Sequence, residues 1–153
     1  DFAGLRPLFL ASAQLRASTC LAIASFCWLI MPTSRRRLGD WGEQLAVDLL
    51  LGKGYRLLAR NWRAGRSGEL DLVMQQGDCL VAVEVRTRRG DAYGRADESL
   101  TAAKQARLAQ LIEIYCAQQA WHGPRRVDVV AISLDVIGHL QELRHIEDAV
   151  SGE

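Results

Sequence analysis

The amino-acid sequence predicts an α/β fold in which helices flank a mixed central sheet, with the core order α-β-β-β-α-β. Two stretches repeat apolar residues at helical spacing, and the stretches between them alternate apolar and polar residues as strands do. The chain has 153 residues, of which 49% are hydrophobic and 24% charged. These values fit one globular domain and exclude a globally disordered chain.

The first helix is expected over Gly39–Lys53, where Trp41, Leu45 and Leu49 share one face, and Gly54 ends it. Turn residues and changes of period divide the rest of the chain. The expected elements are a strand at Tyr55–Trp62, a loop at Ala64–Gly68, strands at Glu69–Met74 and Cys79–Thr87, a loop at Arg88–Asp97, a helix at Ser99–Cys116 capped by Ser99 or Thr101, and strands at Val127–Leu134 and Leu140–Ile146.

The two central strands bring acidic residues onto one face of the sheet. If residues 76–77 form a two-residue turn, Glu69 lies opposite Glu84. Asp71 is then diagonal to Glu84, and Arg86 follows on the same face. Like charges in opposed positions destabilise a sheet, so the pattern indicates Mg²⁺ or Mn²⁺ held by Asp71 and Glu84 with support from Glu69. The alternative is a solvated polar face on which Glu84 pairs with an arginine.

Arginine makes up 17 of the 19 basic residues, which suits contact with phosphate groups. Because a guanidinium stays protonated at neutral pH, the role of Arg86 would be electrostatic rather than that of a base. Trp62 would stack on a nucleic-acid base or pack in the core. The arginines expected to contact a nucleic-acid backbone, or alternatively to form a solvated charged surface, are Arg60, Arg63, Arg66, Arg88 and Arg89.

Residues 1–38 form a tail of different composition. An apolar run of about 12 residues ends at Met31, which is too short to span a bilayer and lacks the flanks of a cleaved secretory signal. We favour Met31 as the true start, with translated upstream sequence before it, and a single-span anchor is the alternative. The domain, 39–150, is then expected in the cytoplasm, where the cysteines, which form no C-x-x-C pair, stay free thiols.

Several motifs occur in a distinctive order: Trp41-Gly42-Glu43, Gly54-Tyr55, Arg60-Asn61-Trp62-Arg63, Gly68-Glu69-Leu70-Asp71-Leu72, Val83-Glu84-Val85-Arg86-Thr87-Arg88, Lys104 and Val127-Asp128-Val129-Val130. Together they resemble the YraN-like family of small uncharacterised bacterial proteins. The resemblance implies the PD-(D/E)XK, restriction-endonuclease-like fold, which is similar to that of archaeal Holliday-junction resolvases.

The resemblance also implies roles for individual residues. Asp71 would be the motif aspartate, Glu84 the second metal ligand and Glu43 the first-helix acid that assists the metal. The motif lysine, two residues after Glu84, is Arg86 here, and Lys104 in the next helix is available for that role. For Glu43 and Lys104 the alternative is a solvated position on the helix surface.

The sequence therefore predicts a nucleic-acid-binding protein, a metal-dependent endonuclease that hydrolyses phosphodiester bonds in DNA or structured nucleic acid. Cutting both arms of a junction would require a homodimer, and no membrane partner is expected. Two alternatives stay open. One is a module that keeps the nuclease fold and binds nucleic acid without turnover, and the other is a protein-interaction domain whose acidic C-terminal segment binds a partner.

Overall fold

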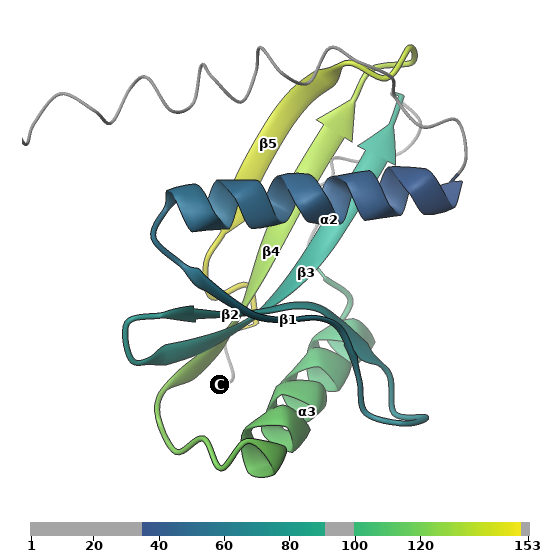
Figure 1. Ribbon diagram of the computed structural model, residues 1–153. Coiled ribbons are helices and arrows are strands. Elements are labelled where there is room, and N and C mark those ends of the chain that lie inside the picture. Colours follow the sequence, from purple (N-terminus) through teal and green to yellow (C-terminus); the bar gives the residue numbers. More distant parts are fainter. Residues whose placement is uncertain (1–34, 91–99, 151–153) are drawn as a thin grey trace, which may run out of the picture. The chain divides into compact units, whose positions relative to one another are not determined.

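Five strands form one mixed sheet with a helix packed on each face in the computed structural model of the chain (Figure 1). The structure describes residues 35–90 and 100–150, which belong to one unit of the chain, Pro32–Glu153. The elements are α2 (Arg35–Gly52), β1 (Arg56–Arg63), β2 (Glu69–Gln76), β3 (Cys79–Arg89), α3 (Ala102–Gln118), β4 (Arg125–Leu134) and β5 (Leu140–Ile146).

The strands are ordered β1-β2-β3-β4-β5 in the sheet. The first three strands form an antiparallel meander. Helix α3 then crosses over, so that β3 and β4 are parallel, and β5 returns antiparallel to β4. The predicted α/β fold and its α-β-β-β-α-β order are confirmed, and the final strand has the expected bounds, Leu140–Ile146.

The helix ends follow from local chemistry. After α2, Gly54 takes φ +87°, and the Tyr55 N–H donates to Leu50 O at 3.0 Å, which closes the last turn. Helix α3 is capped by Thr101, whose hydroxyl oxygen accepts from the Lys104 N–H at 3.3 Å. Helix α2 begins earlier than expected and α3 later, while the other candidate cap, at residue 99, lies outside the described residues.

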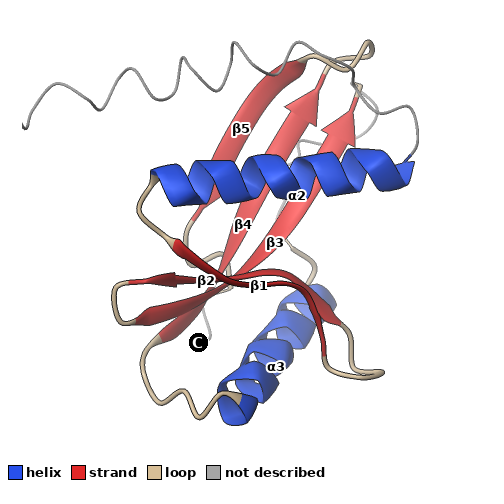
Figure 2. Ribbon diagram, viewed as in Figure 1, coloured by secondary structure: helices blue, strands red, loops and turns tan. Residues whose placement is uncertain are grey.

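Successive side chains of a strand point to opposite faces of the sheet, one of which packs against α2 and the other against α3. Ala82 of β3 and Val127 of β4 belong to a buried cluster with Leu111 of α3. Thr87 and Ile132, which have the opposite parity on the same strands, lie near α2. Helix α2 crosses β3, β4 and β5 (Figure 2). Because both faces are covered, a polar side chain in the middle of the sheet is largely removed from water.

Asn61 adopts a left-handed backbone conformation directly before Trp62, which packs against the core. Asn61 has φ +48°, a left-handed conformation that asparagine tolerates better than most residues. The Trp62 indole then packs edge-on against the Tyr115 ring of α3, with 5.1 Å between the ring centroids. The Trp62 side chain is therefore partly buried and packs against the hydrophobic core, which agrees with one of the two interpretations of the sequence.

The hairpin between β2 and β3 differs in register from the expected one. Its two-residue turn is at 77–78 and not at 76–77, because Gly77 takes φ +59°, the conformation that such a turn needs at its first central position. The register therefore shifts by two residues, which leaves each side chain on its expected face. The expectation that Glu69 lies opposite Glu84 is wrong.

The described residues test some of the expectations about membrane spans and cysteines. Neither helix within residues 35–90 and 100–150 is long and apolar enough to cross a membrane. In the same residues Cys79 and Cys116 are free thiols, as expected. The predicted start at Met31 lies outside the described residues.

Gly42 marks a close approach between α2 and the sheet. A Cβ atom at this position would lie 2.1 Å from Thr87 Oγ1 and 3.4 Å from Ile132 Cδ1. The absence of a side chain lets the helix come this near to β3. The approach fixes the place from which Glu43, the next residue, reaches the sheet.

We predict that Gly42→Ala lowers the free energy of unfolding by about 1–3 kcal/mol, because the buried Thr87 hydroxyl must move to admit the methyl group. The matched control is Gly39→Ala in the same helix, where a Cβ would meet nothing within 4 Å. This control should gain up to about 1 kcal/mol from helix propensity. Urea unfolding of both variants measures the difference, and equal effects would contradict the close approach.

Candidate functional site

Asp71 and Glu84 lie opposite each other on neighbouring strands. The paired residues of β2 and β3 end at Leu72–Val83, so Asp71 and Glu84 are the next residues on the two strands, and the charge of Glu84 acts on Asp71. Side chains in such positions have Cβ atoms about 4.5–5.5 Å apart. The backbone N–H of Val85 donates to Asp71 Oδ2 at 2.8 Å and orients that carboxylate. The structure thus brings the two predicted metal ligands together.

Lys104 of α3 places its ammonium group at this pair. Nζ lies 2.9 Å from Glu84 Oε2, and the Glu84 side chain is only 12% exposed. This ion pair offsets part of the charge on a carboxylate oxygen that is shielded from water. Lys104 therefore contacts one of the two predicted metal ligands, although its own side chain is 38% exposed.

The surroundings of Asp71 change its acidity. Burial raises the pKa of Asp71 from 3.8 to about 6, and the charges of Glu84 and Glu43 raise it as well. The Val85 N–H and the Lys104 ammonium lower this pKa, but by less. Ionisation of Asp71 is therefore opposed first by burial and then by the neighbouring carboxylates.

Glu43 acts on the site from α2 and is oriented by Asn61 of β1. The Asn61 amide donates from Nδ2 to Glu43 Oε2 at 3.0 Å. Asn61, with its left-handed backbone, therefore links β1 to the site. Glu43 is close enough for its charge to raise the pKa of Asp71, so the first-helix acid contributes at least electrostatically.

Glu69 and Arg86 flank the opposed pair along their strands, each two residues from one of the acids. Glu69 is exposed, and its Oε2 accepts a hydrogen bond from Arg63 Nε at 3.0 Å. Arg86 is half-buried and follows Glu84 on the same face of β3. Within residues 35–90 and 100–150, no group of three or more His, Cys, Asp or Glu side chains could hold a metal ion together. The expected convergence of three carboxylates is thus replaced by an opposed pair.

The donor chemistry of this pair fits a hard divalent cation. Mg²⁺ takes oxygen ligands, usually one or two carboxylates together with waters and substrate phosphate. Asp71 and Glu84 offer carboxylate oxygens of this kind, and the Asp71 carboxyl group carries a raised pKa. The chemistry of these two donors therefore fits Mg²⁺ or Mn²⁺.

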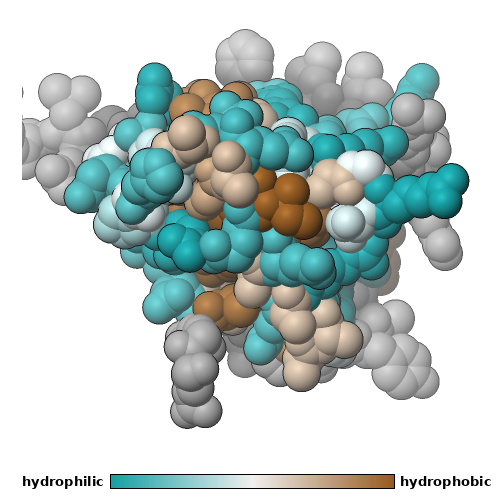
Figure 3. Space-filling model, turned by 90° about the horizontal axis from the view of Figure 1, so that it is seen from below, coloured by the Kyte–Doolittle hydropathy of each residue, from teal (hydrophilic) through white to brown (hydrophobic). Residues whose placement is uncertain are grey.

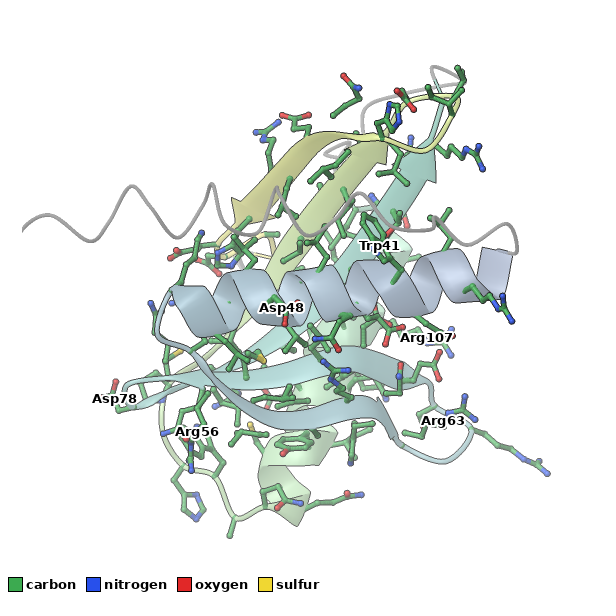
Figure 4. The ribbon with its side chains drawn as sticks, turned by 45° about the horizontal axis from the view of Figure 1, so that its top comes forward. Trp41, Asp48, Arg56, Arg63, Asp78 and Arg107 are labelled. Carbon is green, nitrogen blue, oxygen red and sulfur yellow. The ribbon has the colours of Figure 1, made fainter. Side chains whose placement is uncertain are left out.

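A pocket of about 370 Å³ opens beside the carboxylates, and Lys104 belongs to both. We call it the arginine pocket, and the charged residues that line it are Arg63, Arg66, Glu69, Lys104 and Arg107. Arg63 and Arg107 lie at the same end of the molecule (Figure 4). Two of the arginines predicted to contact phosphate are therefore grouped next to the candidate metal ligands.

The other predicted phosphate-contacting arginines have different surroundings. Arg60 donates to Gln44 Oε1 of α2 at 2.9 Å. Arg89, the last residue of β3, donates from Nε and Nη2 to Val136 O at 3.1 and 2.9 Å. Arg88 is half-buried next to it. Arg89 thus supports the loop between β4 and β5.

Arg107 is a site residue that the sequence analysis missed. Its Nε–H donates to Ser67 O at 3.0 Å, and its guanidinium lies over Gly68, where a Cβ would come within 2.8 Å of Nε. Gly68 has φ +136°, which a residue with a side chain rarely adopts. The signal that could have found Arg107 is its spacing from Lys104, because residues three apart share a helix face.

A second polar cluster surrounds the buried Asp128 of β4. Arg126 Nε donates to Asp128 Oδ1 at 2.9 Å, His145 Nε2 lies 2.8 Å from Oδ2, and the Asp148 N–H donates to Oδ1 at 3.0 Å. Burial acts to raise the pKa of Asp128, but these hydrogen bonds outweigh it and lower the pKa. The cluster ties β5 and the turn after it to β4, so its role is structural.

The part of the chain that matches known proteins includes the carboxylate pair and Lys104. Residues 42–132 match the uncharacterised protein family UPF0102. A UPF0102 protein of Symbiobacterium thermophilum is 50% identical over 107 residues, which are 69% of this chain and 90% of that protein. UPF0102 proteins of Herpetosiphon aurantiacus and Roseiflexus castenholzii are 47% identical over 109 residues (68% of this chain, 87% of that protein) and 46% identical over 122 residues (78% and 98%). These matches confirm the YraN-like resemblance, and the chain belongs to the bacterial protein family UPF0102.

Proposed function

We propose that this protein binds nucleic acid and, with Mg²⁺ or Mn²⁺, hydrolyses phosphodiester bonds in DNA or structured nucleic acid. The observation that carries the proposal is the pair of opposed carboxylates, Asp71 and Glu84, beside the Lys104 ammonium. Opposed like charges cost stability in a sheet, so their presence calls for a reason beyond folding. A carboxyl group with a strongly shifted pKa beside a charged partner is typical of functional sites.

The architecture supports the restriction-endonuclease-like fold that the sequence resemblance implies. A helix, a three-stranded meander, a crossover helix and a parallel strand follow one another in the expected order. The two acids stand on adjacent strands of the meander, and the lysine comes from the crossover helix. The contact of Lys104 with Glu84 therefore supports the hypothesis that Lys104 takes the place of the motif lysine.

The residues of the site would divide the work by charge. Asp71 and Glu84 would hold the cation, which when bound supplies Lewis-acid stabilisation of a phosphoryl group. Lys104, beside Glu84, would donate to a non-bridging phosphate oxygen. Arg86, on the same face of β3, would add a permanent positive charge. Glu43 would support the pair through its own charge.

Binding without turnover is the second candidate function. The observation in its favour is Arg86 at the position of the motif lysine. A guanidinium binds phosphate well but cannot give or take a proton at neutral pH, so a site built around it would hold nucleic acid without cutting it. The cleavage experiment below separates the two candidates.

We predict that Asp71→Asn stabilises the metal-free protein above pH 6. The folded-state pKa of about 6 lies above the usual unfolded value of about 3.9. Folding therefore takes up a proton between these values, and the free energy of unfolding falls as pH rises through that window. Asparagine avoids this loss, which corresponds to about 2–3 kcal/mol at pH 8 and fades below about pH 4.

Urea unfolding in EDTA at several pH values measures this effect. The matched control is Asp48→Asn, an exposed position of α2, which should change stability by less than about 0.5 kcal/mol at every pH. An Asp71→Asn variant that is less stable than the wild type at pH 8, by an amount that does not vary with pH, would contradict the raised pKa of Asp71.

We predict metal-dependent cleavage that requires both acids. The full chain is incubated with labelled duplex, single-stranded and four-way-junction DNA in Mg²⁺, Mn²⁺ or EDTA. Asp71→Asn and Glu84→Gln should each reduce the rate at least about 100-fold, while Asp48→Asn cuts at the wild-type rate. Lys104→Gln should be slower than the wild type because it removes the charge beside Glu84.

The results of this experiment distinguish the candidates. Cutting that survives Asp71→Asn would contradict the assigned site. Binding of DNA without cutting in either metal would support the module without turnover. No binding of any of the three DNA forms would contradict both candidates.

A further inference from the structure

We propose that the arginine pocket is a phosphate subsite, which binds a phosphate group of a single nucleic-acid strand next to the phosphate held at Asp71 and Glu84. The inference rests on the proposed function and adds a second anchoring point to it. Two such points would fix the path of the strand across the site.

The charge and size of the pocket favour a phosphate group. Among the described lining residues, three arginines and Lys104 face a single carboxylate, Glu69, so this part of the lining carries net positive charge. A volume of about 370 Å³ is near the lower end of the range for ligand sites, roughly 300–1,000 Å³. The pocket therefore has room for a phosphate-sugar unit. Among the described residues its lining includes no aromatic side chain, so base stacking is not expected.

Arg107 is held in place for this role. Its Nε–H is bonded to Ser67 O, and the bare backbone of Gly68 makes room for the guanidinium. A guanidinium carries five N–H donors, so four remain after the bond to Ser67. A positioned guanidinium with spare donors matches the geometry of phosphate oxygens.

Lys104 connects the pocket to the carboxylates. Its ammonium lies 2.9 Å from Glu84 Oε2, and its side chain also lines the pocket with Arg107, one helical turn further along α3. Consecutive phosphates of one strand could therefore contact consecutive turns of the same helix. The described surface seen from below in Figure 3 is mainly hydrophilic, with apolar residues in small areas.

Glu69 opposes phosphate binding from within the pocket. Its carboxylate holds Arg63 through the Nε contact at 3.0 Å and would repel a phosphate group. Removing this charge should tighten binding. This expected gain is useful as a test, because a variant that simply unfolds cannot bind more tightly.

The test is the affinity of the full chain for fluorescein-labelled oligothymidylate in EDTA, measured by fluorescence anisotropy at several salt concentrations. Arg107→Gln should raise Kd about 5- to 10-fold and lower the salt slope by about 0.7, the value for one single-strand phosphate. Glu69→Gln should lower Kd about 2- to 5-fold. The matched control is Arg56→Gln, an exposed arginine at the other end of β1, which should leave Kd within about 2-fold (Figure 4).

Two kinds of probe identify the source of the phosphate. An oligothymidylate with hydroxyl groups at both ends offers backbone diesters alone, and the same oligomer with a 5′-phosphate adds a terminal monoester. An Arg107→Gln effect on both probes indicates a backbone phosphate, and an effect confined to the phosphorylated probe indicates a strand end. Either result supports the subsite. The effect should disappear on a probe whose phosphates are replaced by neutral methylphosphonates.

The proposal is overturned if Arg107→Gln binds every probe as tightly as Arg56→Gln does, or if Glu69→Gln binds more weakly than the wild type. Because these measurements are made without metal, they are separate from the cleavage assay. A wild type that cuts DNA while Arg107→Gln binds normally would reject the subsite alone. A wild type that needs Arg107 for binding but never cuts would reject the nuclease activity alone.

Discussion

The structure depends on placing two carboxylates, Asp71 and Glu84, close together in a sheet that is covered on both faces. Neighbouring groups lower the free-energy cost of this placement. The antiparallel pairing of β2 with β3 sets Asp71 opposite Glu84, where burial and mutual repulsion both oppose ionisation. One N–H of the same hairpin and the ammonium of Lys104 offset part of that cost. The rest of the cost is not offset, so the pKa of Asp71 stays raised. Asp128 differs, because hydrogen bonds from several residues lower its pKa and keep the carboxylate charged.

The helices contribute to the site in different ways. Helix α3 supplies two cations from successive turns, Lys104 at the carboxylates and Arg107 at the pocket. Helix α2 supplies Glu43, and it can do so because Gly42 lets it approach β3 closely. A sheet covered on both faces provides the low-polarity surroundings in which these charges act strongly. The site therefore depends on residues from nearly the whole folded unit, not on one loop.

The sequence predicted the faces of the sheet more reliably than the partners on them. Alternation placed Asp71 and Glu84 on one side correctly, because a shift of two residues in register leaves the parity of every side chain unchanged. The opposed partner was wrong because neighbouring two-residue turns fit the same pattern, and the φ value of Gly77 decided between them. Arg107 was missed because its orientation depends on a loop carbonyl and a bare glycine backbone, which its three-residue spacing from Lys104 does not show.

The most direct test of the account is metal binding itself, measured apart from cutting. Titration of the full chain with Mn²⁺, followed by electron paramagnetic resonance, counts the bound ions and gives their affinity. The account predicts one ion per chain that is displaced by Mg²⁺, lost in both Asp71→Asn and Glu84→Gln, and retained in Asp48→Asn. Wild-type protein that binds no Mn²⁺, or binding that persists in both site variants, would contradict the claim that these opposed carboxylates form a metal site.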